Sequence, residues 1–129
     1  MKFARWVFNI AAIYGVLIVT PLYFMERTIG EQNPPAITHP TFFYGFAGVT
    51  LAWQLLFFGI ARQPVRLRPV IPFAVIEKLS FVIAAIVLYR QGRLDHNDLW
   101  LAAIDLILAL LFFLAWRGLD RLSRHPESE

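Results

Sequence analysis

The sequence lacks cysteine and carries little charge. None of its 129 residues is cysteine, and only 16% are Asp, Glu, Lys or Arg. The absence of cysteine excludes a disulfide scaffold, a thiolate metal site and thiol–disulfide chemistry. A soluble domain usually carries about 25% charged residues, so the low charge argues against an ordinary soluble enzyme. The 58% of hydrophobic residues and the mean hydropathy of +0.57 predict a small polytopic membrane protein instead.

Four stretches are long and apolar enough to cross a bilayer as helices, which needs about 20 residues each. They cover residues 6–25, 40–61, 69–89 and 99–116. The first is longer than the apolar core of a signal peptide, so we expect it to be retained. Helices satisfy their own backbone polar groups in lipid. With short connections, the sequence predicts a single all-α membrane domain over residues 1–129, an up-down four-helix bundle.

The basic residues predict the orientation of these spans. Eight of the 12 Lys and Arg residues fall on one predicted side: Lys2, Arg5, Arg62, Arg66, Arg68, Arg117, Arg121 and Arg124. Only Arg27, Arg90 and Arg93 fall on the other. Positive residues concentrate on the cytoplasmic side, so both termini should face the cytoplasm. We expect Arg62, Arg66 and Arg68 to contact lipid headgroups, which explains the basic pI without a nucleic-acid partner.

Charged residues inside the spans are the most informative feature. Glu77 and Lys78 interrupt the third span and Asp105 interrupts the fourth, and each needs a partner or water there. At about 1.5 Å of rise per residue, Tyr14 and Gln54 fall at the depth of Glu77. We therefore expect these five residues to form an intramembrane polar cluster, with Glu77 pointing inward and hydrogen-bonded. The cluster is either a structural network that fixes helix register, or a proton, cation or ligand site.

Small residues predict which helix faces pack together, because membrane helices associate through them. The second span carries two such stripes, of which the first is Gly45, Gly48, Ala52 and Gly59. The second stripe is Ala47, Thr50, Gln54 and Ala61. The fourth span places a similar stripe at 3–4 spacing, namely Ala102, Asp105, Ala109, Phe112 and Trp116. We expect all three stripes to face the bundle interior.

The loops carry few candidates for chemistry. The prolines in residues 31–40 favour an extended crossing without a helix, and His39 stands at the outer mouth of the bundle as an interface residue or a site. Gly92 should end the third span, and Asn97 or Asp98 should cap the fourth. Asp95, His96 and Asp98 are more typical of a capped turn than of a metal site. We assign no catalytic residue, metal or cofactor.

The layout resembles the DoxX-like group of small four-helix bacterial membrane proteins. The likeness rests on a short basic N-terminus, Pro21-Leu-Tyr, Tyr44-Gly45 and the arginine-rich loop 62–68. The resemblance implies a multi-pass protein of the bacterial inner membrane. Three functions stay open: a non-catalytic accessory or partner-binding subunit, a small proton-coupled transporter or channel acting as an oligomer, and, from the resemblance, a membrane subunit of a quinone-linked redox complex. We favour the first.

Overall fold

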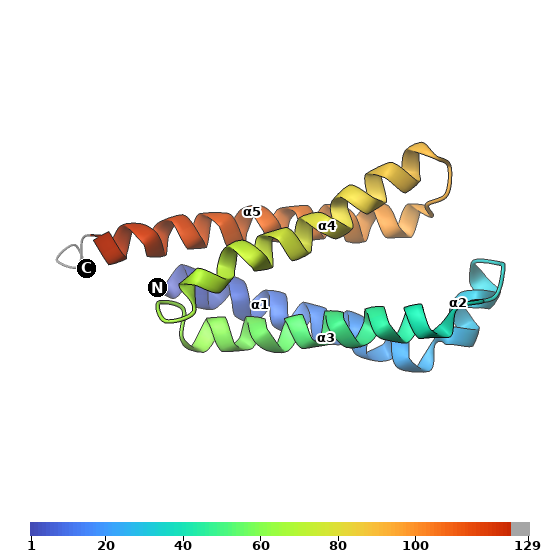
Figure 1. Ribbon diagram of the computed structural model, residues 1–129, viewed down its shortest axis with the longest axis horizontal. Coiled ribbons are helices and arrows are strands. Elements are labelled where there is room, and N and C mark those ends of the chain that lie inside the picture. Colours follow the sequence, from blue (N-terminus) through green and yellow to red (C-terminus); the bar gives the residue numbers. More distant parts are fainter. Residues whose placement is uncertain (125–129) are drawn as a thin grey trace. The chain divides into compact units, whose positions relative to one another are not determined.

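The computed structural model describes residues 1–124, and this part of the chain is helical with no strand (Figure 1). The all-α class predicted from the sequence is therefore confirmed. In chain order the elements are α1 (Lys2–Val19), the 3-10 helix η1 (Thr20–Phe24), α2 (Glu26–Gln32), α3 (Pro40–Arg62), the 3-10 helix η2 (Arg68–Val70), α4 (Ile71–Arg90) and α5 (His96–Arg124).

Four helical segments are long and apolar enough to cross a membrane, which makes the chain a multi-pass membrane protein by length and composition. They are Lys2–Phe24, Pro40–Arg62, Arg68–Arg90 and His96–Arg124. The predicted fourth span ended too early, because α5 continues past Trp116 to Arg124. Its last turns are amphipathic, with Leu119 buried and Arg121 exposed, so they remain helical without being apolar throughout. Residues 125–129 lie outside the described residues.

The chain divides into two compact units. Residues 1–8 and the chain from residue 59 onward form one unit, and residues 9–58 form the other. In the first unit, α4 and α5 pack against each other as an antiparallel hairpin (Figure 1). The first turns of α1 join this unit, because the ring of Phe8 stacks on Phe112 of α5 with centroids 4.3 Å apart.

The turn between α4 and α5 follows from one glycine. Gly92 has a φ of 70°, a left-handed conformation that glycine adopts without a Cβ clash. The amide of Arg93 donates to the carbonyl of Leu88 at 2.8 Å, closing the end of α4 as a Schellman motif. The predicted stop at Gly92 is thus confirmed. The predicted cap was wrong: Asp95, not Asn97 or Asp98, precedes α5, and its carboxylate accepts the amide of His96 at 2.8 Å.

The second unit contains a helix that the sequence analysis did not predict. The short helix α2 extends to Gln32, two residues before Pro34, so the non-helical segment before α3 begins later than expected. Gly30 of α2 is buried, and a Cβ there would lie 3.0 Å from the Cα of Ala36. The chain returning from α2 therefore lies directly on this glycine.

The small-residue stripes are buried on α5 but only in part on α3. Ala102, Ala109 and Phe112 of α5 are buried as expected. On α3, the stripe with Ala47, Gln54 and Ala61 is buried. The other α3 stripe was placed inside correctly only in part, because Gly48 and Gly59 are partly buried whereas Gly45 and Ala52 are exposed.

Candidate functional site

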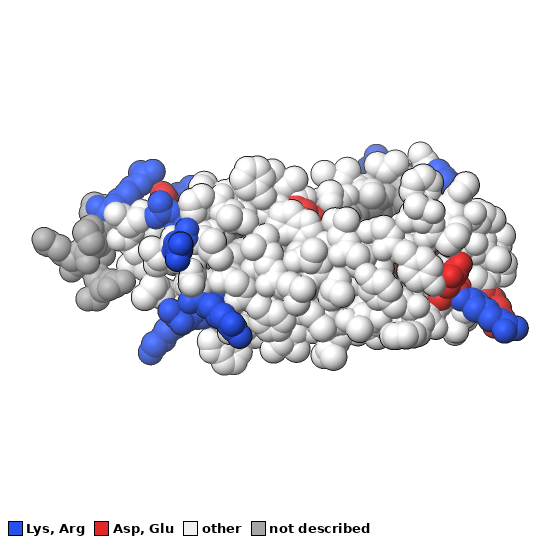
Figure 2. Space-filling model, turned by 60° about the horizontal axis from the view of Figure 1, so that its bottom comes forward, with Lys and Arg blue, Asp and Glu red and all other residues white. Residues whose placement is uncertain are grey.

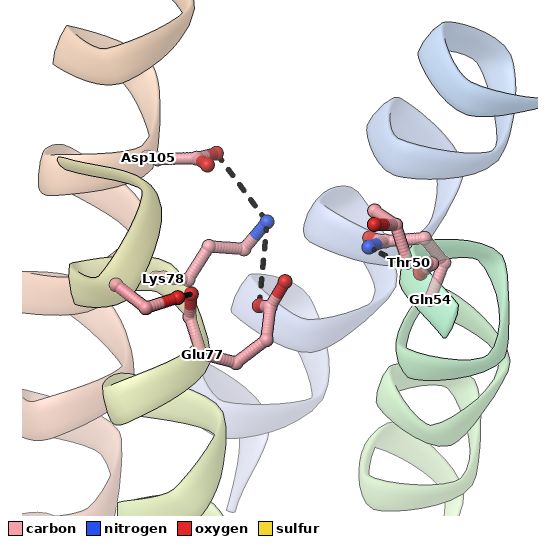
Figure 3. Close-up of polar contacts among 6 residues, drawn as sticks. Thr50, Gln54, Glu77, Lys78 and Asp105 are labelled. Atoms are coloured by element: carbon pink, nitrogen blue, oxygen red, sulfur yellow. Dashed lines mark hydrogen bonds and ion pairs between the residues drawn. The ribbon is translucent and has the colours of Figure 1, made fainter. Parts of the chain in front are cut away.

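An ion-paired triad links α4 to α5 (Figure 3). The Nζ of Lys78 donates to Oδ1 of Asp105 at 3.3 Å and lies 3.9 Å from Oε2 of Glu77. The side chain of Lys78 is 5% exposed, whereas those of Glu77 and Asp105 are 19% and 17% exposed. The structure thus brings together the three charged residues that the sequence placed inside the spans.

The neighbours of the triad explain how a lysine fits between two packed helices. Ala74, one turn before Lys78, and Ala85, two turns after it, are buried on α4. Ala102 and Ala109, on either side of Asp105 in α5, are buried as well. These small side chains leave room for the four-carbon stem of the lysine, so that its ammonium reaches Asp105 on the facing helix.

Glu77 carries the negative charge of the triad that exceeds the single positive charge of Lys78. Two carboxylates face one ammonium, and the hydrogen bond from Lys78 goes to Asp105. Within the described residues, Oε2 of Glu77 is buried and has no hydrogen-bond partner. The expectation that Glu77 is hydrogen-bonded is therefore wrong for this oxygen, which lies 3.9 Å from Nζ of Lys78.

Gln54 belongs to a separate contact in the second unit. Its Nε2 donates to the carbonyl of Thr50 one turn earlier on α3, at 3.0 Å (Figure 3). Its side-chain oxygen is buried without a hydrogen-bond partner in the part of the chain that the structure describes. The amide rests against Gly15 of α1, where a Cβ would collide with it. Tyr14, next to that glycine, is half-buried. That Tyr14 and Gln54 share one cluster with Glu77 stays a prediction.

The loop candidates lie at helix ends. His39 is exposed and immediately precedes α3, and its carbonyl accepts the amides of Phe42 at 3.1 Å and Phe43 at 3.2 Å. Its backbone thus starts α3, while its ring lies 5.6 Å from the ring of Phe42. Arg62 is the last residue of α3; Arg62 and Arg66 are exposed, and Arg68, the first residue of η2, is partly buried.

A polar contact in the second unit escaped the sequence analysis. The hydroxyl of Tyr44 on α3 donates to Oε2 of Glu26 on α2 at 2.8 Å. The ring of Tyr23 lies 6.1 Å from that of Tyr44. Glu26 also lines a cavity of about 320 Å³ with Arg27, Gly30, Glu31, Ala36 and Ile37. The sequence offered no signal for this contact, because the two residues are 18 positions apart and belong to different elements.

Among residues 1–124, no three His, Asp or Glu side chains converge as a group that could hold a metal ion. Comparisons with protein-family models, with curated proteins and with solved structures find no match to this chain. The resemblance to the DoxX-like group therefore remains a prediction, and the candidate site rests on the geometry of the triad.

Proposed function

We propose that this chain is a small proton-coupled transport protein, in which Glu77 takes up and releases the proton. The observation that carries the proposal is the charge balance at Lys78, whose single ammonium faces Asp105 at 3.3 Å and Glu77 at 3.9 Å. Oε2 of Glu77 is buried without a hydrogen bond, and a carboxylate in that position is costly to keep ionised in a membrane. A proton on Glu77 makes the triad neutral, and its release returns one negative charge.

The position of Lys78 couples this proton to the helix pair. When Glu77 is protonated, the ammonium is held by Asp105 of α5, the only ionised carboxylate left in the triad. When Glu77 loses its proton, both carboxylates attract Lys78, and the ammonium is drawn toward its own helix. The protonation state of Glu77 therefore changes the attraction between α4 and α5. A transport cycle requires such a link between proton binding and helix packing.

Infrared spectroscopy tests the proposal without a known substrate. In the reconstituted protein, the C=O stretch of a protonated carboxyl group should vanish reversibly as the pH is raised. Glu77→Gln should abolish this titrating band and retain the fold, since the amide is nearly isosteric. Glu31→Gln is the matched control, because the side chain of Glu31 on α2 is 66% exposed.

The outcomes separate transport from a structural role. A carboxyl band that does not titrate, or one that persists in Glu77→Gln, would mean that the triad only fixes the packing of α4 and α5. If the band behaves as expected, proteoliposomes containing a pH-sensitive dye should report proton entry driven by a membrane potential. That entry should fall to the level of empty vesicles in Glu77→Gln and persist in Glu31→Gln.

A second candidate function, an accessory or partner-binding subunit, is favoured by the outer face of α3. Gly45 and Ala52 are exposed there at a spacing of two turns, and a Cβ at Gly45 would meet nothing within 4 Å. Small residues let another membrane helix approach closely. Since the chain lacks cysteine, Val49→Cys between them gives a single cross-linking site. Cross-links between two copies would support an oligomeric transporter, and cross-links to a different protein would support a subunit role.

We also propose that the protein lies in the bacterial inner membrane with both termini in the cytoplasm. Within the first unit, the start of α1 and the end of α5 lie at the same end (Figure 1), the arrangement expected if both termini face one side. The excess of basic residues at this end supports the cytoplasm as that side.

A further inference from the structure

The first unit carries a strong imbalance of charge at one end. Figure 2 shows Lys and Arg side chains gathered at this end. By their place in the chain, eight basic residues of the first unit belong to it: Lys2, Arg5, Arg62, Arg66, Arg68, Arg117, Arg121 and Arg124. Among the described residues, Asp120 is the one acid at this end, and it already forms an ion pair with Arg124 at 3.2 Å. Within residues 1–124, the remaining cations at this end have no acidic residue left to pair with.

Most of the arginines at this end come from α5 and from the segment that precedes α4. On α5, Arg117, Arg121 and Arg124 follow one another at intervals of four and three residues, which places them on one helix face. The loop before α4 supplies Arg66 and Arg68, and η2, which begins at Arg68, packs against α5. Pro64 and Ile71, at the two ends of this loop region, are buried and hold it in place.

The same stretch of α5 changes from apolar to cationic along its length. Phe113 and Leu114 are 43% and 55% exposed, and Arg117 follows one turn later. The guanidinium carbon of Arg117 lies 6.0 Å from the centre of the Phe113 ring. An exposed apolar surface that meets guanidinium groups at the end of a span matches an acyl chain ending in a phosphate.

We infer that this end of the first unit binds an anionic phospholipid, with Arg66 and Arg68 on one side of the headgroup and Arg117 and Arg121 on the other. Guanidinium groups bind phosphate oxygens with paired hydrogen bonds, which favours a phosphate ligand over a diffuse cloud of small anions. The lipid, rather than free phosphate, is the ligand because the exposed Phe113 and Leu114 adjoin the cationic face. The inference does not depend on proton transport by Glu77.

Native mass spectrometry of the full chain in mild detergent tests this inference. Phosphatidylglycerol and phosphatidylcholine with identical acyl chains are added separately, so that only the headgroup differs. Phosphatidylglycerol should be retained preferentially, and the preference should fall by about fivefold for each arginine removed. We expect this loss in Arg66→Gln/Arg68→Gln and in Arg117→Gln/Arg121→Gln.

Arg90→Gln/Arg93→Gln is the matched control, because it removes two arginines from the opposite end of the same unit. It should leave the preference unchanged. If the control loses as much as the site variants, or if wild-type protein retains both lipids equally, the inference is wrong. Inorganic phosphate, added at a concentration too low to change the ionic strength appreciably, should not displace phosphatidylglycerol. Displacement would show a general anion site instead of a lipid site and would also overturn the inference. Arg→Lys at the same four positions keeps the charge but loses the paired hydrogen bonds. These variants should therefore retain more of the preference than the Gln variants but less than the wild type, which separates loss of binding from misfolding.

Discussion

Gly15 on α1 stands directly against the side-chain amide of Gln54 on α3. A Cβ at residue 15 would overlap the end of the Gln54 side chain, which is 1% exposed and has little room to move. The close packing of α1 and α3 at this point therefore depends on residue 15 having no side chain. In lipid, such close packing replaces the hydrophobic effect as the force between helices.

Gly15→Ala should consequently destabilise the second unit. Overpacking a tight contact typically costs about 1–3 kcal/mol, and the displaced amide of Gln54 would also lose its bond to Thr50. The double variant Gly15→Ala/Gln54→Ala removes the clash and should recover part of the loss. Thermal unfolding in detergent, followed by circular dichroism, measures both effects.

Gly45→Ala on α3 is the control for this experiment. A Cβ at Gly45 would meet no atom within 4 Å, and alanine favours a helix over glycine by about 1 kcal/mol. This variant should be neutral or slightly more stable. Equal destabilisation by both variants would contradict the proposed fit between Gly15 and Gln54.

Lys78→Met should destabilise the hairpin of α4 and α5 more than any single change at the carboxylates. It removes the cation that Asp105 and Glu77 share. Breaking a buried ion pair costs about 3–5 kcal/mol, and we expect about 3 kcal/mol because both acids keep some exposure. Lys78→Met/Asp105→Asn should recover part of the loss, since the charge left without a partner is then reduced.

A double-mutant cycle on Lys78 and Asp105 measures this coupling directly. Lys2→Met, an exposed lysine at the start of α1, is the control and should have little effect. Additive losses in the cycle would show that the 3.3 Å contact contributes nothing to stability.

The sequence predicted the spans and the clustering of the three charged residues within a larger polar cluster, because both follow from one rule. A bilayer requires long apolar helices, and it makes Glu77, Lys78 and Asp105 conspicuous as exceptions within them. Pairing across two helices was expected for the same reason. The hydrogen bond of Lys78 to Asp105 rather than Glu77 was not predictable, because it depends on how α4 and α5 are rotated against each other.

The contacts that the sequence analysis missed depend on tertiary fit. Gly45 and Gly15 are both glycines in apolar helices, yet only Gly15 has a side chain packed against it. Periodicity identifies small residues on a helix face but does not tell which face has a partner. The short helix α2 was missed because seven residues with mixed polarity carry no periodic signal.

Reporter fusions test the orientation of the spans. We expect a reporter that is active only outside the cytoplasm to work when fused near Pro35 or Asp95, in the loops that carry few basic residues. It should be silent near Arg66 and at the C-terminus, which belong to the strongly basic side. A cytoplasmic reporter should give the opposite pattern at all four positions. Activity of the external reporter near Arg66 would contradict both the orientation and the proposed contact with cytoplasmic lipid headgroups.

Tyr44→Phe should loosen α2 without unfolding the protein. The substitution removes the hydroxyl that donates to Glu26 at 2.8 Å and leaves the ring in place beside Tyr23. A hydrogen bond to a charged group contributes about 1.5–3 kcal/mol, and we expect the lower end because both residues are partly exposed. Since α2 is only seven residues long, it has few other contacts to hold it. Hydrogen exchange of the α2 amides should therefore accelerate about tenfold, the factor that about 1.4 kcal/mol of local stability represents. Exchange in α4 and α5 should stay unchanged.

Tyr89→Phe, at a side chain that is 51% exposed on α4, is the control and should leave α2 as in the wild type. If α2 exchanges equally fast in wild type and Tyr44→Phe, the bond to Glu26 does not hold this helix against α3.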